Sequence, residues 1–303
     1  MDKKPYVLFM NESPSMLTRM ISKVRISLNL RDTDKLRKLT EEKLKVKVPD
    51  GVSIEDVLIG DSCCLFSIPR GASQDECIMY LHGGGFTFGG GAYMRRNGIN
   101  FADEFGVRTL SVDYRLAPEN KFPAALEDAL SAYEYLIERY SPSKIVIVGD
   151  SAGGGLAFSL VHKLKQIGKP LPKAIVAFSP WTDLASRGES HIINRSKDLI
   201  FSKNMDFAPE YAPPEEYENP LVSPIYGSFS GFPPMLIIVG GDEVLLSDSI
   251  DLAEKAYKEG VNVEVQVWNR MFHVFPVFGK SVPEAARAMR YVTHFIDRHM
   301  SQS

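Results

Sequence analysis

The stretch that most constrains the fold of this chain is Val146–Gly154, where a β-branched run ends in the pattern Gly-x-Ser-x-Gly around Ser151. This pattern predicts a strand, a sharp turn and a helix, with the serine hydroxyl exposed above the edge of a sheet. Glycines tolerate the strained dihedral angles of such a turn. The first N–H groups of the helix would face any negative charge that forms beside the serine. Taken alone, the pattern is also met in ordinary glycine-rich turns.

A second glycine-rich stretch favours the chemical interpretation. Cys77–Leu81 predicts a buried strand, and His82-Gly83-Gly84-Gly85-Phe86 follows it directly. Acyl transfer needs fixed N–H donors around an oxyanion, and three successive glycines supply amides that a substrate can approach closely. A flexible loop would explain the glycines but not their position between a strand and an aromatic residue, 69 residues before Ser151.

A histidine could serve as the base that activates this serine. His273 is the strongest candidate, because a short loop after the predicted strand Val263–Trp268 could carry it over the strand ends. The other histidines are assigned to the glycine motif, to predicted helices or to a polar segment: His82, His162, His191, His294 and His299.

The acid that would orient this histidine is ambiguous. The predicted strand Met235–Val239 ends in Gly-Gly-Asp-Glu, so Asp242 and Glu243 compete for the role, and Asp248 lies a little further on. The chain order serine, acid, histidine is that of α/β-hydrolases and differs from the orders in the two main serine protease families.

The chain resembles the hormone-sensitive-lipase-like esterases of bacteria and archaea, which have the α/β-hydrolase fold. Three main motifs carry the resemblance, and three shorter stretches match in kind: His82–Phe86, Asp113–Glu119 and Gly149–Gly154, then Phe122–Ala125, Ser179–Trp181 and His273–Phe275. The match runs from about residue 77 to the C-terminus, whereas the first 50 residues match only as a variable helical lead-in.

This resemblance favours Glu243 as the acid. Family members usually carry the acid 30 residues before the histidine and follow it with x-Leu. Glu243 precedes His273 by that interval and is followed by Val244-Leu245, while Asp242 is shifted by one residue and remains the alternative. Most members have aspartate at this position, so a glutamate would be a departure from the common pattern.

The expected reaction is ester hydrolysis through an acyl-enzyme. The residues expected to carry it are the nucleophile, the base, the acid and three backbone N–H donors: Ser151, His273, Glu243, Gly84, Gly85 and Ala152. The resemblance implies Gly84 and Gly85, rather than Gly83, as donors. No metal or organic cofactor is needed, and the resemblance implies short- to medium-chain acyl esters. A deacetylase, an amidase or a carbamate hydrolase would use the same residues. A hormone receptor of the plant gibberellin type would lack the histidine.

Alternating strands and helices predict an α/β protein with a mostly parallel, doubly wound sheet and a helical cap. Six strands are expected, at 77–81, 109–113, 145–149, 174–179, 235–239 and 263–268, after an alternating stretch at 52–68. The expected division is an N-terminal helical cap segment (1–50), a catalytic domain (51–183 and 221–303) and an inserted cap segment (184–220). The inserted segment is expected to set acyl-chain preference.

Four residues of the glycine loop and the inserted segment are candidates for an apolar acyl pocket, although each could instead belong to the core: Phe86, Phe88, Met205 and Phe207. The turn Asp113–Glu119 is expected to be structural, with Arg115 paired internally.

Charge and composition restrict the partners. A formal net charge of -3 leaves no basic footprint for nucleic acid. No stretch reaches transmembrane length, and the apolar run in the first ten residues is too short for a signal peptide. Three cysteines without metal-binding spacing suggest reduced thiols and a cytoplasmic protein: Cys63, Cys64 and Cys77. The resemblance also hints at a homodimer paired through the last strand.

Overall fold

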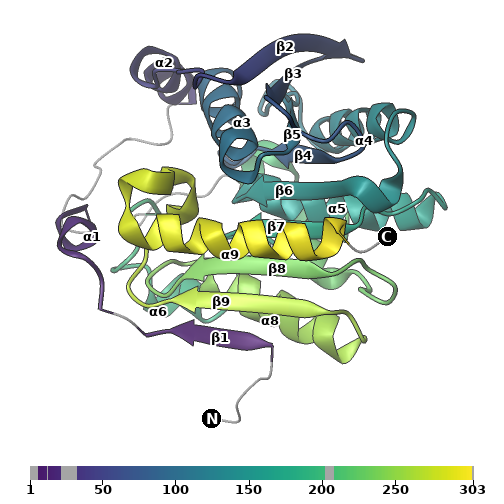
Figure 1. Cartoon of the computed structure of the whole chain (residues 1–303). Coiled ribbons are helices and arrows are strands. Elements are labelled where there is room, and N and C mark those ends of the chain that lie inside the picture. Colours follow the sequence, from purple (N-terminus) through teal and green to yellow (C-terminus); the bar gives the residue numbers. More distant parts are fainter. Residues whose placement is uncertain (1–5, 12, 22–32, 202–207, 302–303) are drawn as a thin grey trace.

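The computed structural model describes residues 6–11, 13–21, 33–201 and 208–301. Its described strands form one sheet in the order β1-β9-β8-β7-β6-β4-β5-β3-β2 (Figure 1). The strands are β1 (Val7–Met10), β2 (Val52–Ile59), β3 (Ser62–Pro69), β4 (Cys77–Leu81), β5 (Arg108–Val112), β6 (Ile145–Asp150), β7 (Ala174–Phe178), β8 (Met235–Gly240) and β9 (Val263–Trp268).

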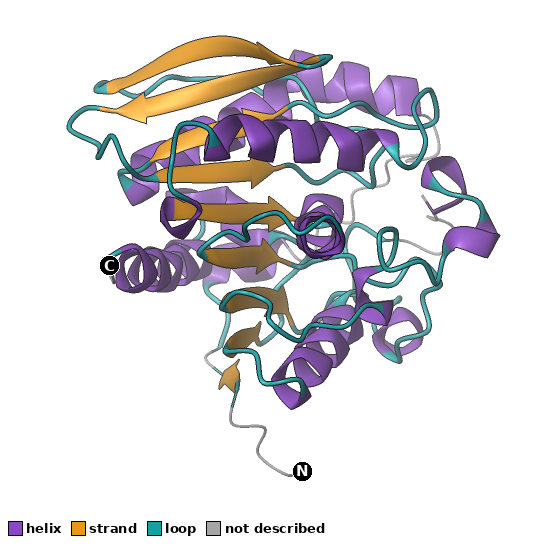
Figure 2. Cartoon of the chain, turned by 90° about the vertical axis from the view of Figure 1, so that its right-hand side faces the viewer, coloured by secondary structure: helices purple, strands orange, loops and turns teal. Residues whose placement is uncertain are grey.

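Helices cover both faces of this sheet. They are α1 (Met16–Ile21), α2 (Thr33–Lys43), α3 (Ala92–Phe105), α4 (Ala124–Ile137), α5 (Ala152–Gln166), α6 (Ser190–Ile193), α7 (Ala208–Tyr211), α8 (Leu246–Lys258) and α9 (Pro283–Met300). Helices α3 and α9 pack on one face, and α4, α5 and α8 pack on the other (Figures 1 and 2). Short 3₁₀ turns add η1 (Pro142–Lys144), η2 (Pro214–Glu216), η3 (Pro224–Tyr226) and η4 (Phe275–Ser281).

The sheet is parallel from β1 to β5 and antiparallel at the β5–β3–β2 end. Every residue of β4, β6, β7 and β8 is buried, which explains their continuous apolar sequences, since helices cover both faces of such strands. The prediction of an α/β-hydrolase fold with a mostly parallel sheet is confirmed. The six expected strands are found within one residue of their expected ends.

Strand β1 was not predicted from the sequence. It contains four residues, and its pattern is too short to distinguish from a loop. What makes it a strand is a tertiary contact, because Val7 to Met10 pair in parallel with Val265 to Trp268 of β9. Strand β9 is therefore flanked on both sides within the described chain.

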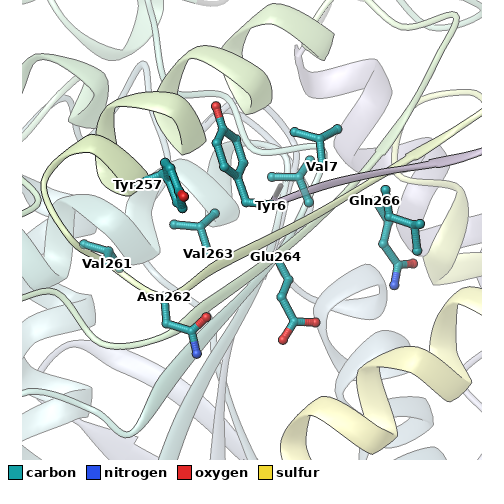
Figure 3. Close-up of a pocket in the computed structure, with 10 residues that line it drawn as sticks. Tyr6, Val7, Tyr257, Val261, Asn262, Val263, Glu264 and Gln266 are labelled. Carbon is teal, nitrogen blue, oxygen red and sulfur yellow. The ribbon is translucent and has the colours of Figure 1, made fainter. Parts of the chain in front are cut away.

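A groove lies where β1 meets β9 (Figure 3). Its volume is about 460 Å³, and the rings of Tyr6 and Tyr257 pack against each other with centroids 4.5 Å apart. The residues that line it include no serine, cysteine or histidine. This groove lies at the edge of the sheet, away from the carboxyl end of β6, where the reactive residues of the chain meet.

Within the expected N-terminal helical cap segment (1–50), helical character was predicted over residues 12–46. The described part of that stretch contains α1 and α2, but residues 13–15 and 44–46 are not helical, and residues 12 and 22–32 lie outside the described ranges. Helix α2 packs against α3 near the antiparallel end of the sheet (Figure 1). Among the described residues, no helix combines the length and the apolar character needed to cross a bilayer.

Candidate active site

Ser151 lies at the sharp turn between β6 and α5. Its φ of 53° is in the left-handed region that L residues seldom adopt. The flanking glycines are required by space, because a Cβ at Gly149 would overlap the carbonyl oxygen of Gly153, and one at Gly153 would overlap that of Leu81. The predicted strand–turn–helix is therefore present. Ser151 is only 6% exposed but lines a cavity at the carboxyl ends of the strands.

The structure brings His273 and Glu243 to this serine from distant parts of the chain. Nε2 of His273 lies 2.9 Å from Oγ of Ser151, and its Nδ1 lies 2.8 Å from Oε2 of Glu243. His273 comes from the loop after β9 and Glu243 from the loop after β8, so all three converge at the carboxyl edge of the sheet. In this arrangement the imidazole Nδ1–H donates to the carboxylate, and Nε2 accepts the serine hydroxyl.

Glu243, rather than Asp242, contacts the histidine. The Glu243 side chain is fully buried, and its second oxygen accepts the hydroxyl of Ser179 at 2.8 Å and the backbone N–H of Gly240. Asp242 is half-buried, and its carboxylate forms no ion pair with His273 in the described structure. Asp248, the third carboxylate considered, binds His191 at 2.6 Å and so lies outside the site.

The electrostatics favour a protonatable imidazole. Burial lowers the pKa of His273, but the hydrogen bond and charge of Glu243, with smaller effects of Asp198 and Asp150, outweigh it, so that the pKa is raised. Burial raises the pKa of Glu243, and the hydrogen bond from His273 opposes this. A histidine with a raised pKa can take up a proton from a hydroxyl as it becomes a nucleophile.

Three backbone N–H groups adjoin the serine. Gly84 and Gly85 have φ of 117° and 58°, and a Cβ at Gly84 would overlap the carbonyl oxygen of Phe88, so this loop conformation requires glycine. In the part of the chain that the structure describes, the N–H groups of Gly84 and Gly85 have no protein acceptor. Ala152 is the first residue of α5, whose N–H has no partner within the helix. These groups are free to bind an oxyanion.

A buried carboxylate that the sequence did not single out ties the glycine loop to the serine turn. Asp150 accepts the backbone N–H of Gly83 at 3.0 Å and the hydroxyls of Tyr80 and Tyr93, each at 2.7 Å. Burial raises the pKa of Asp150, while these hydrogen bonds oppose it. Its position directly before the serine was visible in the sequence, but its tyrosine partners come from β4 and α3 and have no recognisable spacing.

The cavity beside Ser151 has a volume of about 340 Å³ and mainly apolar walls. The apolar side chains that line it are Leu36, Leu39, Leu44, Phe88, Ile200, Phe201, Val274, Val277 and Phe278. Phe88 thus lies where an acyl pocket was expected. Phe86 instead packs in the core, stacked on Tyr211 with ring centroids 3.7 Å apart. Met205 and Phe207 lie outside the described residues.

The remaining motif residues have structural contacts. Arg115 binds Asp128 through two nitrogens, at 2.8 and 3.0 Å, as expected for a residue paired internally. His162 is buried, its Nε2 lies 3.1 Å from the carbonyl of Pro224, and burial lowers its pKa to about 4. The described residues contain no group of three or more histidine, cysteine, aspartate or glutamate side chains placed to hold a metal ion.

Comparison with known proteins supports the same fold and chemistry. Residues 78–277 match the model of a family described as having the alpha/beta hydrolase fold. An acetyl-hydrolase of Streptomyces hygroscopicus is 35% identical over 249 residues, which cover 81% of this chain and 83% of that protein. An ethyl acetate hydrolase of Pseudomonas putida is 31% identical over 238 residues, or 76% and 75% of the two chains.

Solved structures agree over nearly the whole length. The crystal structure of an esterase from the bacterial hormone-sensitive lipase family is 36% identical, has a TM-score of 0.86, and matches 94% of this chain and 97% of its own. A mutant of the esterase E40 is also 36% identical, with a TM-score of 0.87 and matches of 99% and 100%. The resemblance to hormone-sensitive-lipase-like esterases is confirmed, and this chain belongs to the family of hydrolases with the α/β-hydrolase fold.

Proposed function

We propose that this hydrolase is a serine esterase that cleaves short- to medium-chain carboxylic acid esters through an acyl-enzyme. The observation that carries the proposal is the continuous hydrogen-bonded chain from Ser151 through His273 to Glu243 beside an apolar cavity. The relatives named as an acetyl-hydrolase and an ethyl acetate hydrolase support the reaction type.

The proposed acylation step follows from the geometry. Oγ of Ser151 attacks the ester carbonyl while Nε2 of His273 takes its proton, and Glu243 stabilises the imidazolium through Nδ1–H. The N–H groups of Gly84, Gly85 and Ala152 bind the negative charge that develops on the carbonyl oxygen. The imidazolium then protonates the departing alcohol.

Deacylation repeats these roles with water as the nucleophile. His273 removes a proton from the water, which attacks the acyl carbonyl, and the same N–H groups hold the oxyanion. Collapse of the intermediate returns the proton to Oγ of Ser151 and releases the acid. Every proton transfer uses side chains already within hydrogen-bond distance, so this chain's own residues account for each step.

The test is a Ser151→Ala variant. We expect it to fold normally but to lose hydrolysis of p-nitrophenyl butyrate by roughly 10⁴-fold or more. A fluorophosphonate probe should label the wild-type chain at Ser151 and leave the variant unlabelled. Near-normal turnover by a folded Ser151→Ala protein would remove the serine from its proposed role. A panel of matched amides, carbamates and acetylated sugars would show whether esters are the preferred class.

The presence of a base argues against a hormone receptor of this fold. His273 is hydrogen-bonded to Ser151 and to Glu243 at distances suited to catalysis. A receptor of that type would be expected to lack this histidine. Labelling by the fluorophosphonate probe distinguishes the two functions directly.

Two further proposals concern the setting of the protein. The three cysteines are unpaired, which supports a reducing compartment such as the cytoplasm. A homodimer paired through the last strand, β9, would need to use β1 or to displace it, because β1 already pairs with β9. Light scattering of the wild-type chain and of a Phe9→Pro variant would test such pairing. The backbone groups of Phe9 face away from β9, since Tyr6 and Met10 are the residues that bond to it, and proline removes a donor from that open edge.

A further inference from the structure

The inserted segment holds the loop that carries Glu243. Nδ2 of Asn194, at the end of α6, donates to the carbonyl oxygen of Glu243 at 3.0 Å and to that of Gly241 at 3.2 Å. Oδ2 of Asp198, four residues later, accepts the backbone N–H of Val244 at 2.8 Å. Side chains of a single turn thus bind both the carbonyl oxygen and the N–H of the peptide group between Glu243 and Val244.

Asp198 also fixes the ring that covers His273. Its other oxygen accepts the backbone N–H groups of Ile200 and Phe201 at 2.8 and 2.9 Å. The Phe201 ring meets the imidazole edge-on, with ring centroids 4.8 Å apart and planes at 73°. One carboxylate therefore contacts, through different oxygens, the acid loop on one side of the histidine and a wall of the cavity on the other.

These contacts are sheltered from solvent. Asn194 is 2% exposed, Asp198 6% and Val244 5%. Among the described residues, loss of Asp198 would leave the N–H of Val244 without a partner. Loss of Asn194 would leave the carbonyl oxygen of Gly241 without one and that of Glu243 with only the N–H of Leu246, at 3.4 Å. Each polar group that loses its partner costs about 1–3 kcal/mol. The loop would then relax away from its present position, and Glu243 would move with it.

We propose that Asp198, assisted by Asn194, is a positioning residue for the proposed ester hydrolysis. It holds the Glu243 loop against His273 and the Phe201 ring over the imidazole, so that the acid and the base meet in the geometry needed for proton transfer. The inference rests on the proposed function, because it assigns Glu243 and His273 their catalytic roles. The inserted segment is accordingly part of the support of the catalytic residues as well as a cover for the substrate.

An ordinary structural turn would also be buried and hydrogen-bonded, so the test must separate stability from catalysis. Asp198→Asn does so, because the amide oxygen of asparagine can still accept the hydrogen bonds from the N–H groups of Ile200 and Phe201. Its NH₂ group would then face the N–H of Val244, donor against donor. The pocket wall is retained while the acid loop loses its anchor. Displacement of a catalytic group by about 1 Å can cost 10²-fold in rate.

The chain offers a matched control in Asp183. This aspartate is 4% exposed, lies at the entry to the inserted segment, and accepts the backbone N–H groups of Ala185 and Arg187 and the hydroxyl of Tyr226. None of these groups belongs to the acid loop. Asp183→Asn therefore removes the same charge from an equally buried turn without touching Glu243 or His273.

We expect kcat for p-nitrophenyl butyrate to fall by about 10- to 100-fold in Asp198→Asn, with KM changed less than about threefold. Asp183→Asn should keep the wild-type kcat even if its melting temperature falls. The acid limb of the kcat/KM profile should move to lower pH in Asp198→Asn alone, because the charge of Asp198 helps to raise the pKa of His273, together with Glu243 and Asp150. A turn that merely stabilised the fold would leave kcat unchanged in both variants.

A second variant and a spectroscopic readout keep the inference open to contradiction. Asn194→Ala removes the hydrogen bonds to the carbonyl oxygens of Glu243 and Gly241 and should lower kcat by about tenfold. The low-field proton resonance of the His273–Glu243 hydrogen bond should weaken or shift in Asp198→Asn and in Asn194→Ala, and should persist in Asp183→Asn. This resonance can be recorded without substrate. Wild-type kcat and an unchanged resonance in a folded Asp198→Asn protein would overturn this inference and leave the proposed function intact. A wild-type chain that neither hydrolyses esters nor reacts with fluorophosphonate would instead overturn the proposed function.

Discussion

Two segments outside the central strands meet the active site, and they are attached in different ways. Helix α2 contributes Leu36 and Leu39 to the wall of the cavity, and Leu44 follows directly after the helix. The inserted segment also contributes to that wall, through Ile200 and Phe201, but in addition it binds the backbone of the acid loop. Of these two segments, only the inserted one has hydrogen bonds to the loop that carries Glu243 among the described residues.

The ion pair that attaches α2 lies near the surface. Arg37 donates to the carbonyl oxygens of Thr87 and Ala117 and forms an ion pair with Glu119, whose side chain is 55% exposed. Such exposed pairs contribute about 0–1 kcal/mol to stability. The inserted segment is held by side chains that are almost fully buried, so its release would expose unsatisfied groups and cost more.

A cap segment can therefore have two separate roles: it can line the cavity, or it can hold the loop that carries the acid. A segment that lines the cavity sets which acyl groups fit, and its changes should appear in KM and in chain-length preference. A segment that holds the acid sets the rate of proton transfer, and its changes should appear in kcat. The sequence led to the expectation that residues 184–220 act on chain length. The contacts of Asn194 and Asp198 add a role in catalysis.

The largest effect is expected at the acid that the inserted segment holds. Glu243→Ala should lose about 10⁴-fold in kcat, because the histidine is no longer kept in the tautomer that accepts the serine proton. Asp242→Ala should stay close to the wild-type rate, because its half-buried carboxylate does not contact His273. Assays of both variants, with circular dichroism to show folding, provide the measurement. The opposite ranking would move the acid to Asp242 and leave the serine esterase proposal intact.

The residual activity of Glu243→Gln should show a pH dependence that is shifted in a definite direction. The hydrogen bond and charge of Glu243 raise the pKa of His273, and the base must be neutral to accept a proton. Removal of that charge should therefore move the acid limb of kcat/KM to lower pH. A limb that stays in place would show that Glu243 does not act on the titrating group.

The next largest effect is expected from a substitution on α2, which should change KM. Leu39→Trp adds bulk to the cavity wall and should raise KM for a hexanoyl ester about tenfold relative to an acetyl ester, with kcat for the acetyl ester nearly unchanged. Lys38→Trp is the matched control, since that side chain is 76% exposed on the same helix. Equal behaviour of the two variants would show that α2 does not border the acyl site.

Much of this arrangement could be predicted from the sequence because it depends on local patterns. Buried parallel strands have continuous apolar runs, and the turn at Ser151 requires the glycines that flank it. The interval between Glu243 and His273 was instead supplied by the family resemblance, and one helix and one strand occupy it. The structure places both side chains as that interval suggested.

The unpredicted features depend on contacts between distant residues. Strand β1 exists because β9 offers an edge, and Asp150 is held by tyrosines 57 and 70 residues away. Asp198 reaches Val244 across 46 residues, in a segment whose sequence has neither helical nor strand periodicity. Hydrogen bonds from side chains to backbone leave no periodic signal, because any loop that passes close enough can supply the partner.

The smallest effect is expected in the pH dependence of the attachment between the inserted segment and α8. Nε2 of His191 lies 2.6 Å from Oδ1 of Asp248, whose other oxygen accepts the N–H groups of Thr182 and Asp183. Burial lowers the pKa of His191, but the hydrogen bond and charge of Asp248, with the charge of Asp183, outweigh burial and the nearby Arg195, so that the pKa is raised.

A histidine whose pKa is higher in the folded than in the unfolded chain stabilises the fold below its unfolded pKa, and this stabilisation is lost as the pH rises through the folded pKa. His191→Gln should therefore lower the melting temperature by about 2–4 °C more at about pH 5.5 than at about pH 9. The matching change at the attachment of α2 is Glu119→Gln, which removes the ion-pair partner of Arg37 and should have the same small effect at both pH values. The hydrogen bond from Arg37 lowers the pKa of Glu119 to about 2, and so that pair does not titrate in this range. If the two variants showed the same pH dependence, the buried and the exposed attachments would not differ in the way that the structure indicates.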